Sequence, residues 1–201
     1  MTTNNCIVEN IEDPFKLFDI WYNEAILNEL NDPNAMSLAT ATLQGIPSVR
    51  MVLMKDYNKS GFVFYTNKNS RKGKEISKNK FASICFHWKS LNRQVRVDGL
   101  LEEVDSITAD NYFLSRSKLS QISSVASEQS STLKDRQDFL NKIDNIKKKY
   151  ENKSIPRPSH WSGFCLIPNE IEFWLDQPFR AHDRKVFFKK DDIWESKRLY
   201  P

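Results

Sequence analysis

A series of short apolar runs joined by tight turns constrains the fold of this chain more than any other feature. In order, the first five runs are AMSLATAT (35–42), IPSVRMVLMK (46–55), FVFYTN (62–67), FASICFHW (81–88) and RQVRVDGLLEEV (93–104). The turns at 44–45 and 58–61 are too short for parallel crossovers, so the adjacent runs should pair antiparallel. Many half-buried strands without long helices between them predict a closed antiparallel barrel.

Helical patterns precede and interrupt the strand-like runs. Asp13-Pro14 has the pattern of an N-cap followed by proline at the first helical position, and it predicts a helix with an apolar stripe. The stripe consists of Leu17, Phe18, Trp21, Ala25 and Leu30. Residues 106–152 have helical character, and 162–201 return to strands. We therefore expect a mainly β protein with helices (α+β), with a short polar leader at 1–12, a single domain at 13–201 and a late helical insertion.

The charge balance and the cysteines argue against several classes of protein. The 201 residues include 30 Lys and Arg against 26 Asp and Glu, and the net charge of +4 suits small anionic ligands at least as well as nucleic acid. Cys6, Cys85 and Cys165 lack the spacing of a disulfide framework, and no CxxC or HxxxH pair indicates a metal site. No apolar stretch reaches about 18 residues, so we expect a cytoplasmic protein without a membrane partner.

Two motifs carry cations where an anion could bind. In FYTNKNSRKGKEI, a strand ends at Thr66 and Ser70 can cap a helix whose first turn carries Arg71 and Lys72. In RMVLMK, Arg50 and Lys55 are five positions apart and would point to opposite faces of a regular strand. Either they serve two phosphate groups or a bulge redirects one of them. A solvated helix start and a barrel rim are the alternatives without a ligand.

Two further motifs supply polar groups that suit a phosphate monoester. In NYFLSRSKLSQ, Tyr112, Arg116 and Ser120 fall at i, i+4 and i+8, which predicts one face of a single helix. An exposed polar helix face is the alternative. In RQVRVDG, Gln94 shares a strand face with two charged residues, and the SEQSS turn at 127–131 supplies an amide and hydroxyls. Each motif is weak alone.

The stretch IEFWLDQPFRAHDR (171–184) begins as a strand and ends as a cluster of charge. Pro178 prevents a simple continuation of the strand, and Arg180, His182 and Arg184 follow it. Trp174 offers an apolar wall nearby. No nucleophile stands beside a base, whereas phosphate-binding groups recur along the chain. The combination suggests a phosphorylated cofactor that performs the chemistry on a phosphorylated substrate.

The order of these motifs resembles that of the pyridoxine/pyridoxamine 5′-phosphate oxidase family, from about Asp13 to Pro201. The matching stretches are RMVLMK, FYTNKNSRK, RQVRVDG, YFLSRSKLSQI, SEQSS, IEFW, RAHDR and RLYP. The resemblance implies a split β-barrel homodimer with FMN at the subunit interface. It also implies oxidation of pyridoxamine or pyridoxine 5′-phosphate at the C4′ carbon to give pyridoxal 5′-phosphate. A hydride would pass to the flavin, and O2 would reoxidise the flavin with release of H2O2, and of NH3 from the amine.

The resemblance also assigns roles to individual residues. The implied FMN-binding residues are Arg50, Tyr65, Thr66, Ser70, Arg71, Lys72, Gln94, Gln129, Ser130, Trp174 and Arg184. The implied pocket for the substrate phosphate consists of Lys55, Tyr112, Arg116 and Ser120. Arg180 and His182 would lie against the pyridine ring and act as the catalytic residues. Arg50 and Lys55 would then serve one phosphate each.

The chain departs from the family pattern mainly on the substrate side. Residues 1–12 contain neither the Arg nor the Tyr of the family's N-terminal segment. Ser123 and Val125 replace a Gly and a Trp, and Ala181 replaces a Leu. The turn LDQPF, just before RAHDR, lacks the usual glycines. None of these departures falls on a residue that the resemblance assigns to FMN binding.

Three other functions stay open from the sequence. A split-barrel flavoprotein with a different substrate, or a non-catalytic FMN-binding or haem-handling barrel, would share the fold. The lysines at 147–149 suggest nucleic-acid binding, although lysines at a solvated helix C-terminus explain them as well. A second phosphate pocket together with RAHDR favours the oxidase, because a bare flavin carrier has no use for that pocket.

Overall fold

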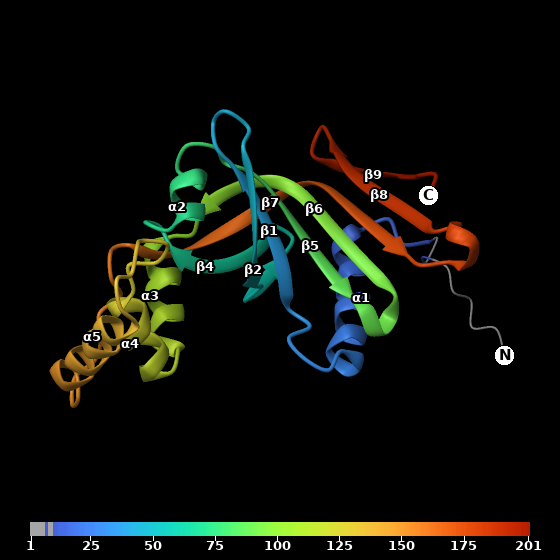
Figure 1. The fold of residues 1–201 in the computed structure, drawn as a ribbon. Coiled ribbons are helices and arrows are strands. Elements are labelled where there is room, and N and C mark those ends of the chain that lie inside the picture. The colour runs from blue at the N-terminus through green and yellow to red at the C-terminus, as the bar shows by residue number, and fades with distance from the viewer. Residues whose placement is uncertain (1–6, 8–9) are drawn as a thin grey trace.

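The computed structural model describes residue 7 and residues 10–201, and strands dominate it (Figure 1). The strands are β1 (Ala35–Ala41), β2 (Pro47–Leu53), β3 (Asp56–Asn58), β4 (Gly61–Asn67), β5 (Phe81–Trp88), β6 (Arg93–Glu103), β7 (Trp161–Leu175), β8 (Asp183–Lys190) and β9 (Ile193–Arg198). The α-helices are α1 (Pro14–Asn28), α2 (Arg71–Ile76), α3 (Ser106–Ser115), α4 (Lys118–Ala126) and α5 (Arg136–Lys149). Short 3₁₀ turns occupy Lys89–Leu91 and Pro178–Arg180.

The strands form one curled sheet, and the described pairings are all antiparallel. The order is β2-β1-β5-β6-β7-β4-β3, and the β8–β9 hairpin adds to β7. The two ends of this path, β2 and β3, are consecutive in the chain, separated by Met54 and Lys55. The antiparallel split barrel expected from the sequence is confirmed. Its ladder of hydrogen bonds, however, is open between β2 and β3 in the described part of the chain, and the chain itself crosses the gap.

Strand β7 runs the length of the sheet and changes its neighbour midway. Its first residues pair with β4, its last residues pair with β8, and β6 pairs with it from Phe164 to Leu175. The β6–β7 register shifts between Asp98 and Gly99, where β7 carries one extra residue, Asn169. A bulge of this kind bends a strand, and Gly99 permits the close approach because a Cβ there would lie 2.0 Å from the Ile167 carbonyl oxygen. The bend curls the sheet.

Helix α1 fills one side of the curled sheet with aromatic side chains. Asp13 caps it by accepting the N–H of Phe15, as the sequence predicts. Phe18 lies 4.9 Å from Phe62 and 5.3 Å from Phe86, measured between ring centroids. Leu17, Trp21 and Ala25 are buried with them. The prediction for Leu30 is wrong, because the helix ends at Asn28 and Leu30 is 92% exposed.

The predicted helical insertion is confirmed as three helices at one end of the molecule, opposite the β8–β9 hairpin (Figure 1). The helices share a small core of their own, formed by Phe113, Ile122, Ile155 and Trp161. The lysines at 147–149 form the exposed last turn of α5, as expected for cations at a helix C-terminus. Because Trp161 is the first residue of β7, the small core also packs the insertion against the start of that strand.

Ile7 and the C-terminal strand meet at the β8–β9 hairpin, where Arg198 donates to the Ile7 carbonyl oxygen over 3.3 Å. Of the predicted leader, residues 1–6 and 8–9 lie outside the described residues, and so does Cys6. Ile7 is fully buried and its N–H donates to Asp183 Oδ2 over 2.8 Å. Cys85 and Cys165 are free and half-buried, and burial raises the pKa of both thiols. Among the described helices, none is both long and apolar enough to span a membrane.

Candidate active site

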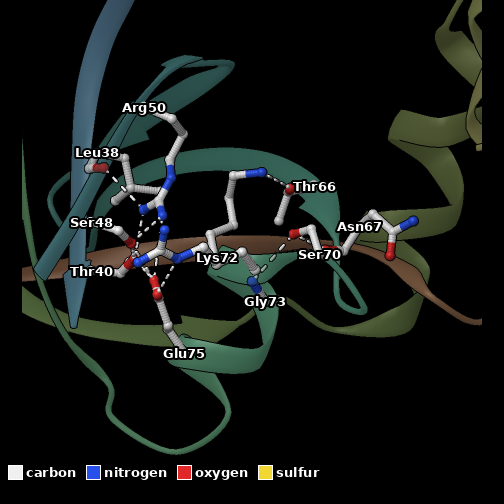
Figure 2. A network of polar contacts seen from close by, with 11 residues as sticks. Leu38, Thr40, Ser48, Arg50, Thr66, Asn67, Ser70, Lys72, Gly73 and Glu75 are labelled. Carbon is white, nitrogen blue, oxygen red and sulfur yellow. Dashed lines mark hydrogen bonds and ion pairs between the residues drawn. The ribbon is translucent and has the colours of Figure 1, made fainter. Parts of the chain in front are cut away.

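The first part of the site is a cationic cluster at the start of α2, here called the phosphate cluster: Arg50, Thr66, Ser70, Arg71 and Lys72 (Figure 2). Ser70 caps α2, because its Oγ accepts the Gly73 N–H and donates to the Asn67 carbonyl oxygen over 2.6 Å. The cap follows directly from the end of β4, as the sequence predicts. The Ser70 hydroxyl is fully buried and already has both partners, so the fold itself accounts for this serine.

A buried carboxylate that the sequence analysis missed organises the phosphate cluster. Glu75 Oε2 lies 3.3 Å from an Arg50 nitrogen, and Oε1 lies 3.0 Å from Arg71 Nε. Ser48 Oγ donates to the same carboxylate over 2.6 Å. Burial acts to raise the pKa of Glu75, but the hydrogen bonds from Ser48, Thr40, Arg71 and Arg50 outweigh it and lower the pKa to about 2. The i, i+4 spacing of Arg71 and Glu75 was the available signal.

The phosphate cluster holds more positive charge than Glu75 neutralises. Lys72 is only 8% exposed, and its ammonium donates to Thr66 Oγ1 over 3.1 Å. Burial lowers the pKa of Lys72, and the neighbouring Arg50 charge lowers it further. Three cations therefore face one carboxylate in the described site. Lys72 is buried and Arg50 is 20% exposed, whereas Arg71 is 62% exposed. Burial of the first two cations is costly without an anionic ligand, and a phosphate dianion fits this donor set.

Lys55 does not belong to the phosphate cluster. Its side chain is exposed beyond the end of β2, and its backbone N–H donates to the Val63 carbonyl oxygen over 2.8 Å. Arg50, by contrast, turns back along β1 to bond the Leu38 carbonyl oxygen and Thr40. The two cations of RMVLMK are thus separated, as the alternation of a strand requires.

The second part is an aromatic pocket between β4, the helical insertion and the first residue of β7. The ring of Tyr65 stacks on Tyr112 at 3.9 Å and on Trp161 at 5.2 Å. The Arg116 guanidinium lies 4.9 Å from the Trp161 ring centroid. A cavity of about 490 Å³ is lined by Tyr65, Thr66, Arg116, Ser120 and Gln129, among others. Residues of the implied FMN and substrate sets therefore meet here; Trp161 was not foreseen.

The prediction that Tyr112, Arg116 and Ser120 share one helix is wrong. Helix α3 ends at Ser115, Arg116 is its extended C-cap, and Ser117 caps α4. A helix–turn–helix brings the residues to one place instead. Arg116 donates to Ser124 Oγ over 2.8 Å, and burial lowers the pKa of its guanidinium. The capping serine was the signal for the break.

The third part, here called the hairpin cluster, lies at the far end of β7. Gln94, Trp174 and Arg184 are ladder neighbours on β6, β7 and β8. His182 packs on Trp174 with ring centroids 4.6 Å apart. Arg184 Nε donates to the buried Glu172 carboxylate over 2.7 Å, a hydrogen bond that raises the pKa of Arg184.

The remaining site residues lie in loops with unusual backbone. Arg180 is exposed at φ 61°, next to Phe179 at φ 60°. Ser130 has φ 71° and lines a cavity of about 510 Å³ beside Arg71 and Glu75. Residues other than glycine rarely hold positive φ, and such strain clusters at functional sites.

The structure places the implied site residues in two groups, which lie at opposite ends of strand β7 within one copy of the protein. The aromatic pocket contains Trp161, the first residue of β7, and the hairpin cluster contains Trp174. Thirteen steps along a strand correspond to about 40 Å of extended chain. Figure 1 shows the helical insertion and the β8–β9 hairpin at opposite ends of the curled sheet. A single small ligand cannot contact both ends.

The fold is that of a split-barrel protein, and the phosphate cluster gives it a concentration of positive charge that suits an anionic ligand. The sequence profile described as "Pyridoxamine 5′-phosphate oxidase" matches residues 22–150, and that described as "Pyridoxine 5′-phosphate oxidase C-terminal dimerisation region" matches 161–201. The chain belongs to the pyridoxamine 5′-phosphate oxidase family. It is 52% identical to the pyridoxine/pyridoxamine 5′-phosphate oxidase of Pelagibacter ubique, over 98% of this chain and 96% of that protein. It is 50% identical to that of Gluconobacter oxydans, over 94% of each.

Two solved structures share the fold. PhzG from Burkholderia lata 383, crystallised with tetrahydrophenazine-1-carboxylic acid, gives a TM-score of 0.93 over 100% of this chain and 98% of that chain, at 27% identity. A pyridoxamine 5′-phosphate oxidase-related, FMN binding protein from Nostoc punctiforme gives 0.76 over 94% and 98%, at 16% identity. The second likeness is one of fold alone.

Proposed function

We propose that this protein is an FMN-dependent oxidase that converts pyridoxamine or pyridoxine 5′-phosphate to pyridoxal 5′-phosphate. O2 is the electron acceptor, H2O2 is released, and the amine substrate also takes up water and releases NH3. The observation that carries the proposal is the presence of two neighbouring cationic sites, the phosphate cluster and the Arg116 side of the aromatic pocket. Thr66 belongs to both, because it accepts from Lys72 and lines the cavity. The relatives from Pelagibacter ubique and Gluconobacter oxydans, about 50% identical in sequence, are named pyridoxine/pyridoxamine 5′-phosphate oxidase.

In this proposal the phosphate cluster binds the FMN phosphate. The excess of positive charge at the mostly buried Arg50 and Lys72 and at the more exposed Arg71 supports this placement. Gln129 and Ser130 border the cavities beside it, and Gln94, Trp174 and Arg184 complete the cofactor site. When bound, FMN supplies the acceptor for a hydride from the substrate and returns the electrons to O2.

The substrate phosphate is held by Lys55, Tyr112, Arg116 and Ser120. A guanidinium with a neighbouring hydroxyl is suited to a phosphate monoester, and Arg116 and Ser120 line the same cavity. Arg180 and His182 lie against the pyridine ring and orient it, so that the C4′ carbon faces the cofactor. Their role is positioning of the two rings and charge stabilisation at the substrate.

The protein acts as a homodimer, and each active site takes residues from both copies. The distance along β7 between the aromatic pocket and the hairpin cluster supports this arrangement, because a two-fold related copy can supply the missing half. The outer face of β2 exposes Val49 (69%), Met51 (65%) and Leu53 (37%), an apolar surface that suits a partner subunit. The match to the dimerisation region at 161–201 supports the same conclusion. A cytoplasmic location stays a prediction from the sequence.

A second candidate is a split-barrel flavoprotein with a substrate other than a B6 vitamer. The likeness to PhzG favours it, since that protein was crystallised with a phenazine derivative. A phenazine carboxylate carries no phosphate, however, and offers Arg116 and Ser120 fewer acceptor oxygens and less charge than a phosphate monoester. Addition of pyridoxamine 5′-phosphate to the FMN-loaded protein without O2 tests the proposal. Bleaching of the flavin band that air reverses is the expected result, whereas an unchanged band would contradict it.

A further inference from the structure

An aspartate at the start of the β7–β8 loop contacts the imidazole at its end. Asp176 follows the last residue of β7, and His182 precedes the first residue of β8, so the two stand opposite each other just beyond the Leu175–Asp183 ladder pair. Asp176 Oδ1 lies 2.9 Å from His182 Nδ1. The turn LDQPF carries this carboxylate and contains no glycine.

The contact is held from both sides. The backbone N–H of Asp176 donates to the Asn92 carbonyl oxygen over 2.9 Å, which fixes the start of the loop against the β5–β6 connection. The other face of the imidazole packs on Trp174 at 4.6 Å. The His182 side chain is 22% exposed, and that of Asp176 is 48% exposed. The ring therefore has little freedom to turn, and its remaining nitrogen, Nε2, is the one available to a ligand.

The geometry specifies which nitrogen carries the proton. An ionised carboxylate offers only acceptors, so a 2.9 Å approach to Nδ1 requires a proton on that nitrogen. The Gln177 N–H also lies 3.3 Å from Nδ1, but a nitrogen that donates to Asp176 has no lone pair left to accept from Gln177. The shorter, charge-assisted contact is the stronger of the two.

We propose that Asp176 is a positioning residue that holds His182 with Nδ1 protonated and presents Nε2 to the substrate ring. The catalytic part rests on the proposed function, in which His182 contacts the substrate. A carboxylate behind a histidine fixes both the tautomer and the orientation of the ring. Nε2 can then accept a hydrogen bond from a substrate hydroxyl or amine, or donate one when the ring is protonated.

The hydrogen bond can be measured without substrate. The chain has three histidines, so ¹⁵N-histidine labelling gives three pairs of imidazole nitrogen signals, and the pair of His182 is identified by its loss in His182→Gln. At about pH 8.5, well above the ordinary histidine pKa, we expect a protonated Nδ1 and an unprotonated Nε2 in the native protein. Asp176→Ala should shift the proton toward Nε2. A tautomer that is unchanged in Asp176→Ala would overturn the proposal.

Steady-state kinetics test the positioning role. Asp176→Ala should lower kcat for pyridoxamine 5′-phosphate about tenfold with little change in KM, the smaller loss that follows removal of an orienting carboxylate. In a His182→Ala background, the same substitution should have no further effect, because Asp176 acts only through that ring. An equal loss in both backgrounds, or an unchanged kcat, would overturn the role.

The NMR measurement and the kinetic measurement together distinguish a failure of this inference from a failure of the proposed function. Folding and FMN content of Asp176→Ala are checked first, and both should match the native protein because the Asp176 side chain is half exposed and its backbone bond to Asn92 stays. If the native protein fails to oxidise pyridoxamine 5′-phosphate, the proposed function is wrong. The NMR arm still decides the hydrogen bond in that case.

Discussion

The phosphate cluster and the hairpin cluster are built in opposite ways. In the phosphate cluster, Lys72 and Glu75 are buried, and a capped helix holds them. Next to the hairpin cluster, Arg180 is exposed on a loop whose backbone has positive φ at Phe179 and Arg180. The phosphate cluster thus gathers its cations within one chain. In the proposed dimer, by contrast, the half-buried residues of the hairpin cluster and the exposed Arg180 act on a ligand bound to the other subunit.

The largest expected effect is a loss of turnover when the exposed Arg180 is removed. Arg180→Ala should keep FMN and lose about a hundredfold or more in kcat, because a preorganised charge at the substrate is removed. Arg136→Ala, an exposed arginine at the start of α5, is the matched control and should change neither property. Loss of flavin in Arg180→Ala would mean that this arginine belongs to the cofactor site instead.

A smaller effect is expected on cofactor affinity when the buried Lys72 of the phosphate cluster is replaced. Lys72→Met removes one buried cation while keeping most of the volume, and should weaken FMN binding about tenfold to a hundredfold. Turnover at saturating FMN should change much less. Fluorescence titration of the apoprotein with FMN measures the dissociation constant. An unchanged constant would contradict the assignment of Lys72 to the phosphate.

The phosphate cluster should also set an acid limit to stability. The pKa of Glu75 is lowered from 4.5 to about 2 in the folded protein, so its contribution is present above pH 4.5 and lost as the pH falls toward 2. Glu75→Gln should lower the free energy of unfolding by about 2 kcal/mol at pH 7 and by progressively less in acid. Urea unfolding at pH 7 and pH 3 measures the difference, and an equal loss at both would refute the charge-based explanation.

The smallest effect is expected from the strained loop. Phe179 is fully exposed at φ 60°, a conformation that asparagine adopts more readily. Phe179→Asn should therefore raise the free energy of unfolding, by less than about 1 kcal/mol. Thermal unfolding of the two proteins side by side measures the change. A lower melting temperature would show that the Phe179 ring has a contact that outweighs the strain.

Local patterns explain what the sequence could and could not predict. The strands and the Asp13 and Ser70 caps were predictable because alternation and capping depend on neighbouring residues. The continuity of β7 through the Asn169 bulge was not, since a bulge depends on the partner strand. Trp161 left no signal at all, because its role comes from the insertion folding back onto β4.

The division of the site was equally invisible in the sequence. Periodicity placed Tyr112 and Arg116 on one helix, but the serine cap of α4 breaks that helix and a turn brings them together. The motif order gave no distance between RAHDR and the aromatic pocket. Only the length of β7 shows that RAHDR and the aromatic pocket lie at opposite ends of the molecule.

The central claim is that one active site takes residues from two copies of this chain. Arg116→Ala and His182→Ala, whose own homodimers should keep only a small residual activity, should be produced together with different tags and purified as the mixed dimer. If each site combines the aromatic pocket of one copy with the hairpin cluster of the other, one site carries both substitutions and the other is native, so half of the native activity returns. A mixed dimer without activity would contradict the claim, because a site within one chain would retain a substitution in every copy.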